Sequence, residues 1–177
     1  MSDERTRFAN VVLPHLGDAY ALARWLARND SDAEDIVQEA CLRAFRGIAG
    51  FGNINPRGWV LSIVRNTFYT WLQQNREHAA ETTEFEEDMH SLEAGGAGQD
   101  DSPEATLIRS QSRKRVHNAL SSLRLEYREV IVLRELEELS YKEIADIVGI
   151  PMGTVMSRLG RGRQQLAALL APTDQEA

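Results

Sequence analysis

The sequence has a single cysteine, Cys41, among 177 residues, and no apolar run approaching the length of a membrane helix. One cysteine excludes an internal disulfide, and Cys41 falls in an apolar helical stripe, which favours a small buried side chain over a redox switch. A membrane helix needs about 20 apolar residues, so no membrane insertion is expected. The N-terminus, Met1 to Arg5, lacks the basic start and apolar run of a signal peptide. These absences predict a soluble cytoplasmic protein.

The sequence also has fewer basic than acidic side chains. The chain has 20 Lys and Arg against 27 Asp and Glu, a net charge of -7 and a pI of about 5.2, which disfavours nonspecific attraction to nucleic acid. The shortage is local, because residues 77–104 carry ten carboxylates and no Lys or Arg, whereas residues 105–171 carry 11 basic and 7 acidic side chains. An acidic segment therefore conceals a mildly basic C-terminal part.

The acidic segment also lacks sustained apolar periodicity and contains Gly95-Gly96-Ala97-Gly98. This composition predicts a flexible linker over residues 77–102. The rest of the chain then divides into two small all-α domains with modest cores, residues 1–76 and 103–171, followed by a tail at 172–177.

Residues 139–170 have the pattern of a helix-turn-helix. Ser140 and Glu143 form a capping box at the start of the first helix, Gly149 ends that helix, and Pro151 suits the start of the second. The second helix turns its apolar positions inward and leaves hydroxyls and guanidiniums outside, at Thr154, Ser157, Arg158 and Arg161. These groups bind phosphates and base edges in recognition helices. A solvated face on an ordinary helical hairpin is the less favoured interpretation.

The N-terminal part reads as three helical segments. The first spans residues 8–27 and is interrupted by Pro14. The second begins with a capping box of Ser31 and Glu34 and runs to residue 48, and the third begins at Asn55 as its cap.

The third segment has an outer face of donors, amides and an aromatic ring at helical spacing: Ser62, Arg65, Asn66, Tyr69, Gln73 and Arg76. This mixture suits unstacked bases and a phosphate backbone. Since any surface helix also shows a polar outer face, composition alone leaves both interpretations open.

Three blocks of the sequence are similar to the bacterial extracytoplasmic-function (ECF) sigma factors. They begin Asp32-Ala-Glu-Asp-Ile-Val-Gln-Glu, Asn55-Pro-Arg-Gly-Trp-Val and Tyr127-Arg-Glu-Val-Ile-Val. The resemblance runs from about residue 8 to residue 170. It implies a promoter-specificity subunit that acts by assembly, with RNA polymerase core, promoter DNA and an anti-sigma factor as partners, and with no cofactor.

The resemblance also implies roles for the two domains. The sigma-2-like N-terminal domain would contact the polymerase core through Asp35, Gln38, Glu39, Leu42 and Arg46. It would read the -10 element with the loop residues Phe51, Asn53, Ile54 and Arg57, and with Arg65, Asn66, Tyr69, Gln73 and Arg76 beyond. The four-helix, sigma-4-like C-terminal domain would read the -35 element with Thr154, Ser157, Arg158 and Arg161. For the loop, a plain Gly/Asn turn is the alternative.

Some positions depart from the family pattern. Met156 stands where the family usually has Lys, and residues 73–76 replace a basic run, so DNA affinity is expected to depend more on the polymerase. Gly160 and Gly162 each cost about 1 kcal/mol of helix propensity relative to Ala, which predicts that the distal half of the recognition helix frays when DNA is absent.

Other functions are less favoured. The carboxylates near residue 35 lie in the first turns of a helix, where the dipole favours them, and no His accompanies them, so neither an enzyme nor a metal site is expected. A two-domain helix-turn-helix regulator is the main alternative, but residues 32–76 match the sigma pattern and not a sensor domain. A protein that mimics a sigma domain is a third possibility.

The acidic linker has two interpretations. In one it follows a basic channel of the polymerase, and in the other it is a solubilising spacer.

Overall fold

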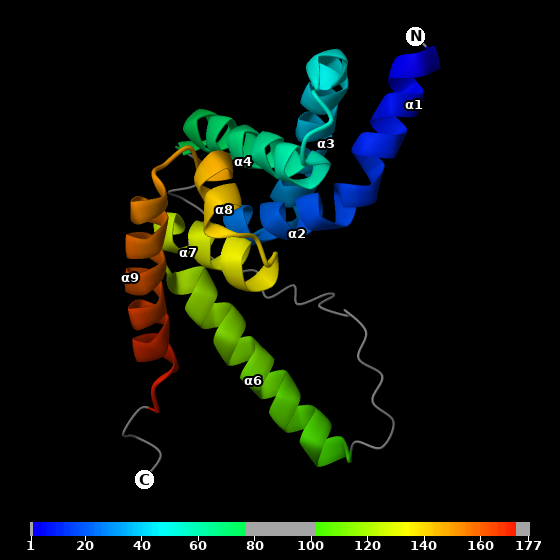
Figure 1. The fold of residues 1–177 in the computed structure, drawn as a ribbon. Coiled ribbons are helices and arrows are strands. Elements are labelled where there is room, and N and C mark those ends of the chain that lie inside the picture. Colours follow the sequence, from blue (N-terminus) through cyan, green and yellow to red (C-terminus); the bar gives the residue numbers. More distant parts are fainter. Residues whose placement is uncertain (1, 77–101, 173–177) are drawn as a thin grey trace.

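The computed structural model describes residues 2–76 and 102–172, here called the N-terminal half and the C-terminal half (Figure 1). Both halves are helical, and neither contains a strand. The all-α prediction is therefore confirmed for the described residues, while most of the predicted linker and tail lies outside them. The N-terminal half contains α1 (Ser2–Val11), η1 (Leu13–His15), α2 (Leu16–Ala27), α3 (Asp30–Gly47), η2 (Ile48–Gly50) and α4 (Pro56–Gln74). The C-terminal half contains α6 (Pro103–Ser122), α7 (Leu125–Ile131), the π-helical turn η3 (Val132–Leu136), α8 (Tyr141–Val148) and α9 (Met152–Leu170).

The ends of the N-terminal helices follow their local sequence, with one correction. Pro14 separates α1 from α2 as predicted, since proline breaks the helical hydrogen-bond ladder. Asn55 caps α4 as predicted, accepting a hydrogen bond from the Gly58 amide at 3.0 Å. The predicted capping box of Ser31 and Glu34 is wrong, because α3 begins at Asp30. Its cap is Asn29, which has extended backbone and accepts from the Asp32 amide at 2.9 Å.

Helices α2, α3 and α4 pack together around one apolar core. Leu22, Ile36, Leu61 and Phe68 are almost completely buried in it. This core fixes the rotation of α4, and so decides which of its polar side chains face away from the N-terminal half.

The helix-turn-helix has the predicted boundaries. Ser140 accepts from the Glu143 amide at 3.1 Å, and the Glu143 carboxylate accepts from the Ser140 amide at 2.8 Å. Gly149 ends α8 in the left-handed region with φ of 75°, where a side chain would be strained. Pro151 is extended, and α9 begins directly after it.

The predicted fraying of α9 is not observed, since the helix is continuous to Leu170. Gly162 is buried against α7, and a Cβ atom at this position would lie 2.7 Å from Cδ1 of Ile131 and 3.2 Å from Cβ of Tyr127. Gly160 lies on the exposed side of α9, with nothing within 4 Å of such a Cβ. Gly162 therefore allows α7 and α9 to approach closely, which the helix-propensity argument overlooked.

The two halves pack directly against each other. Helix α8 lies against α4, while α7 and η3 lie against α2, and α6 projects away from this junction (Figure 1). Two domains separated only by a flexible linker were expected from the sequence. The junction between the halves instead covers part of the polar face of α4.

We expect Gly162→Ala to lower the free energy of unfolding by about 1 to 3 kcal/mol, because overpacking against buried Ile131 outweighs the gain in helix propensity. Gly160→Ala, the matched control on the same helix, should raise it by up to about 1 kcal/mol. Urea unfolding of both variants checks this prediction. Equal stabilisation by the two substitutions would show that the contact between α7 and α9 is loose.

Candidate nucleic-acid interface

The residues predicted to read the -35 element lie on an open surface of α9. Ser157 and Arg161 are exposed, while Thr154 and Arg158 are half-buried. The hydroxyl of Ser157 donates to the Gly153 carbonyl at 3.0 Å, and a DNA ligand can still approach it. The surface of α9 thus remains accessible to a duplex.

Arg163 and Met156 complete the description of α9. Arg163 Nη2 lies 2.6 Å from the Glu135 carboxylate of η3, so this cation forms an ion pair within the C-terminal half. Met156 is half exposed and adds an apolar thioether, not a cation, to this surface. The basic character of the surface therefore depends on Arg158 and Arg161.

The residues predicted to bind the polymerase core share one exposed side of α3. Asp35, Gln38 and Arg46 are exposed, and the side chain of Leu42 is 53% exposed. Glu39 is half-buried and accepts from Arg43, one turn along the helix, at 2.9 Å. The structure thus brings these five residues together on a surface that no other described element covers.

The loop before α4 differs from its prediction at one position. Phe51, predicted to contact DNA, is 7% exposed and packs on Trp59 with ring centroids 4.6 Å apart. Its ring belongs to the core because the chain turns inward after η2. Asn53 and Ile54 are exposed, Ile54 by 83%, so the tip of the loop alone is open to a ligand.

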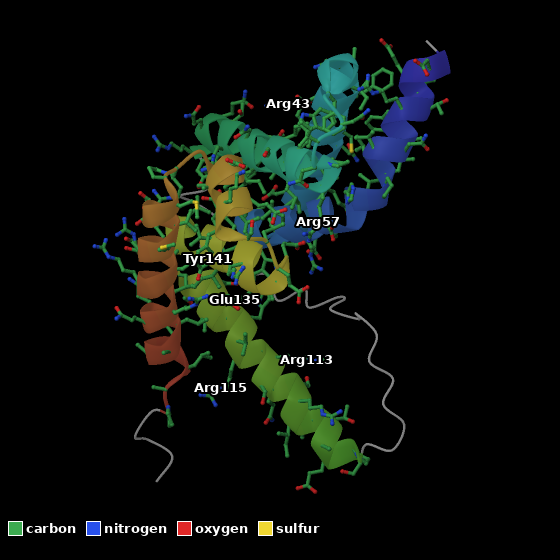
Figure 2. All side chains as sticks on the ribbon, viewed as in Figure 1. Arg43, Arg57, Arg113, Arg115, Glu135 and Tyr141 are labelled. Atoms are coloured by element: carbon green, nitrogen blue, oxygen red, sulfur yellow. The ribbon has the colours of Figure 1, made fainter. Side chains whose placement is uncertain are left out.

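Arg57, predicted to contact the -10 element, connects the two halves (Figure 2). Its Nε donates to Asp18 of α2 at 2.8 Å, and its Nη2 donates to the Glu137 carboxylate at 2.6 Å. Its Nη1 also donates to the Glu137 carbonyl at 2.8 Å. Burial raises the pKa of Glu137, although Arg57 opposes this rise. Arg57 is therefore half-buried between two carboxylates.

Arg65 and Tyr69 of α4 are covered by the C-terminal half, contrary to the prediction of an open outer face. Glu129 of α7 is fully buried and receives a hydrogen bond from Arg65 Nε, another from Arg65 Nη2 at 3.5 Å and a third from the Tyr69 hydroxyl at 3.1 Å. The Arg65 guanidinium also lies over the Tyr69 ring, 4.3 Å from its centroid. Of the outer-face residues, only Asn66, Gln73 and Arg76 remain exposed.

Arg128 was missed from the sequence and anchors the other side of the junction. Its guanidinium donates to the Trp25 carbonyl at 2.9 Å and to the Leu26 carbonyl at 3.2 Å, both in the last turn of α2. It also donates to Leu123 in its own half at 2.9 Å. Burial lowers the pKa of Arg128 to about 10, so it stays charged at neutral pH. A cation at a helix C-terminus is favourable because it satisfies the last carbonyls.

A weaker contact joins the cap residues of the two halves. The Asn55 amide donates to the Glu143 carboxylate at 3.4 Å. Hydrogen bonding from the Ser140 backbone lowers the pKa of Glu143, which is thus ionised at neutral pH. Glu143 and Glu137 thus contact Asn55 and Arg57 at the start of α4, while Glu129 contacts Arg65 and Tyr69 farther along the helix.

Among residues 2–76 and 102–172, no three His, Cys, Asp or Glu side chains cluster as a metal site would require. No helix in this part of the chain is long and apolar enough to cross a membrane. Cys41 is half-buried in the N-terminal half, and burial raises the pKa of its thiol.

Burial, followed by the charge of Glu129, raises the pKa of Tyr69 from its ordinary 10.0 to about 12. Because the phenol of Tyr69 ionises less readily in the folded protein, its neutral form contributes to the free energy of unfolding. This contribution is fully present below pH 10 and is lost as the pH rises through about 12. Absorbance titration of the phenolate, as the difference between wild type and Tyr69→Phe, should show this late phase.

Glu129→Gln should lower the pKa of Tyr69, because it removes the neighbouring charge. An ordinary pKa for Tyr69 in the wild-type protein would contradict the burial of its hydroxyl in the junction.

Two sigma family models match the halves just described. Sigma-70 region 2 matches residues 11–78, and sigma-70 region 4 matches residues 113–166. Among curated relatives, ECF sigma factor SigE of Mycolicibacterium smegmatis is 35% identical over 166 residues, covering 94% of this chain and 62% of that protein. RNA polymerase sigma-H factor of Pseudomonas aeruginosa is 30% identical, covering 98% and 91%. ECF sigma-E factor of Escherichia coli is 35% identical, covering 80% and 75%.

A similar solved structure covers both halves. It is the sigma factor RpoE of Bartonella quintana in complex with the anti-sigma factor NepR, with a TM-score of 0.69 and 28% identity. The match covers 92% of this chain and 96% of that chain.

Proposed function

The chain belongs to the ECF sigma factors of bacterial RNA polymerase, and we propose from this premise that its two halves contact two promoter elements. The observation that carries the proposal is the open surface of α9, with Arg158 and Arg161 beside Ser157 on a capped helix-turn-helix. A guanidinium pairs with the O6 and N7 atoms of guanine in the major groove. We assign this surface to the -35 element.

We assign the -10 element to the loop tip and the outer face of α4. Asn53, Ile54, Asn66, Gln73 and Arg76 are exposed and offer amide, apolar and cationic contacts to single-stranded bases. Arg57, Arg65 and Tyr69 are the remaining members of this surface, and here they contact the C-terminal half. Phe51 positions the loop from the core.

The polymerase core is assigned to the exposed side of α3. This side of α3 carries carboxylates and the exposed Leu42, so it offers both charged and apolar contacts to the polymerase. Because the work of such a factor is assembly on the polymerase, we propose no catalytic residue and place the protein in the cytoplasm. An anti-sigma factor is the further proposed partner, supported by the likeness to RpoE in its complex with NepR.

Run-off transcription with purified bacterial core polymerase tests the function directly. Addition of the protein should give discrete transcripts from genomic promoter fragments that core polymerase alone does not transcribe. A two-domain regulator that does not replace sigma would instead act only in the presence of another sigma factor.

Arg158→Ala and Arg161→Ala should each weaken -35 recognition in the holoenzyme. A lost bidentate contact to guanine costs about 1 to 3 kcal/mol and relaxes specificity at one base pair, whereas a lost phosphate contact weakens all sequences alike. Footprinting on a series of -35 variants separates the two cases. The matched control is Arg163→Ala, since Arg163 is held by Glu135. If footprints and transcription are unchanged in both Arg158→Ala and Arg161→Ala, the DNA surface lies elsewhere.

Asn66→Ala should impair promoter opening while leaving folding and core binding intact. Asn66 is exposed on α4, and its amide is lost from the surface proposed to hold unstacked bases. A premelted promoter removes the unpairing cost of a few kcal/mol and should rescue a melting defect.

The control for this experiment is Gln74→Ala, an exposed amide on another side of the same helix. Normal transcription by Asn66→Ala from duplex promoters would remove Asn66 from the -10 surface.

A further inference from the structure

We propose that Arg7 of α1 is a positioning residue for the loop before α4, and that it holds Asn53 and Ile54 in the conformation that reads the -10 strand. The inference rests on the assignment of this loop to the -10 surface and adds to it a residue from another helix. Arg7 lies 44 residues before Phe51 in the sequence, and the fold brings the two together.

The first observation is the pair of backbone carbonyls that Arg7 reaches. Its Nη1 donates to the Ala49 carbonyl at 3.5 Å, and its Nη2 donates to the Phe51 carbonyl. Ala49 lies in η2, and Phe51 directly follows that turn. The last carbonyls of a helix have no partner within it, and an arginine side chain is a favourable donor to them. Arg7 therefore fixes the backbone where the chain leaves η2 and enters the loop.

Helix α1 is itself held firmly, so that Arg7 acts from a rigid support. Val11 and Val12, about one turn after Arg7, are buried in the apolar core. The Phe8 ring contacts the Phe45 ring of α3 edge to face, with the ring centroids 5.5 Å apart. These contacts place α1 beside α3 and η2 (Figure 1). A positioning side chain needs such a support, because its own precision is limited by that of its backbone.

A second, independent anchor holds the other end of the loop. Asn55 has a left-handed backbone with φ of 50°, and its side chain accepts from the Gly58 amide at 3.0 Å. A Cβ atom at Gly58 would lie 2.5 Å from Nδ2 of Asn55, so the glycine leaves room for this cap. The start of α4 is therefore fixed relative to the end of the loop.

The residues between the two anchors are Gly52, Asn53 and Ile54, and all three are exposed. Asn53 has a left-handed backbone with φ of 58°, and Ile54 is 83% exposed. A short segment with both ends fixed has few conformations to choose from. Because a loop ordered in advance loses less entropy on binding, the anchors should raise its affinity for the strand and sharpen its selection of a base.

The position of Arg7 distinguishes it from the residues proposed to touch DNA. Its side chain is half-buried and its donors face backbone carbonyls, whereas Asn53 and Ile54 are open to a ligand. Loss of a phosphate contact would reduce the salt dependence of binding, by about 1 in the slope of log K against log salt. Loss of a positioning residue leaves that slope unchanged.

Three variants of the full chain test the role of Arg7. Arg7→Met removes the donors and the charge from an unbranched side chain, while Arg7→Lys keeps the charge without the planar fork. The matched control is Arg5→Met, because Arg5 is an exposed arginine on the same helix. Thermal unfolding followed by circular dichroism confirms that each variant is folded, and Arg7→Lys carries the test if Arg7→Met is not.

The first readout is the order of the loop, measured by amide hydrogen exchange with NMR detection. The Phe51 amide donates to the Ile48 carbonyl at 3.2 Å, and this hydrogen bond protects it from exchange. Phe51 should lose protection in Arg7→Met, lose part of it in Arg7→Lys and keep it in Arg5→Met. Unchanged protection in both Arg7 variants overturns the proposal.

The second readout is binding of the non-template -10 strand by holoenzyme assembled from each variant and core polymerase. Arg7→Met should bind the strand of a transcribed promoter roughly threefold to tenfold more weakly, as the ordering of one or two loop side chains predicts. Its preference for that strand over strands with one -10 base replaced should fall as well, with an unchanged salt slope. Arg7→Lys should fall between Arg7→Met and wild type, and Arg5→Met should match wild type.

Two results of strand binding contradict a positioning role. A changed salt slope in Arg7→Met would show that Arg7 contacts phosphate directly. Strand selection restored by Arg7→Lys while the Phe51 amide remains unprotected would show that charge, and not the order of the loop, is what Arg7 supplies.

Asn53→Ala and Ile54→Ala separate this inference from the proposed function. If both variants weaken strand binding and Arg7→Met does not, the positioning role is wrong and the -10 assignment of the loop remains. If neither variant weakens it, the loop is not part of the -10 surface, and the assignment on which the inference rests is wrong.

Discussion

A carboxylate that is completely removed from water must receive hydrogen bonds and a compensating charge, and for Glu129 both come from the other half of the chain. This requirement determines how α7 lies against α4. Glu129 lies on Arg65 and Tyr69. Arg128, the residue before it, reaches the open carbonyls of α2, and Glu137, directly after η3, reaches Arg57. The arrangement of the two halves therefore follows from one buried charge and its neighbours.

The two halves carry complementary charges where α4 meets the C-terminal half. Arg65 and Arg57 of α4 meet Glu129 of α7 and Glu137, which follows η3, while the uncharged amide of Asn55 meets Glu143 of α8. A carboxylate accepts hydrogen bonds from the same fork of guanidinium donors as a phosphate does, and in this structure carboxylates pair with Arg57 and Arg65. The overall charge of -7 opposes nonspecific attraction to free DNA.

Local signals were sufficient for the helix-turn-helix and for most helix boundaries. Ser140, Glu143 and Gly149 act within one helical turn of their partners, so their roles can be read from spacing alone. The start of α3 was misplaced because Asn29 and Ser31 are both good caps and only the structure shows which one is extended. Gly162 was misjudged because propensity is a local quantity, whereas its role is the close contact with Ile131 of another helix.

The predicted site residues also differ in whether their surroundings depend on one helix or on contacts between distant parts of the chain. The surfaces of α3 and α9 depend on one helix each. Helical period predicted the outer face of α9, whereas the residues of α3 were named from the family resemblance. Arg65 and Tyr69 were expected on an equally open face, because the period reports only that they point away from their own core. Which surface they meet depends on a pairing about 60 residues away in sequence with Glu129, for which a single sequence contains no local signal. A polar helix face that points away from its own core can therefore meet solvent, a nucleic acid or another part of the same chain. Only the structure shows which of these it meets, here through the buried partner Glu129.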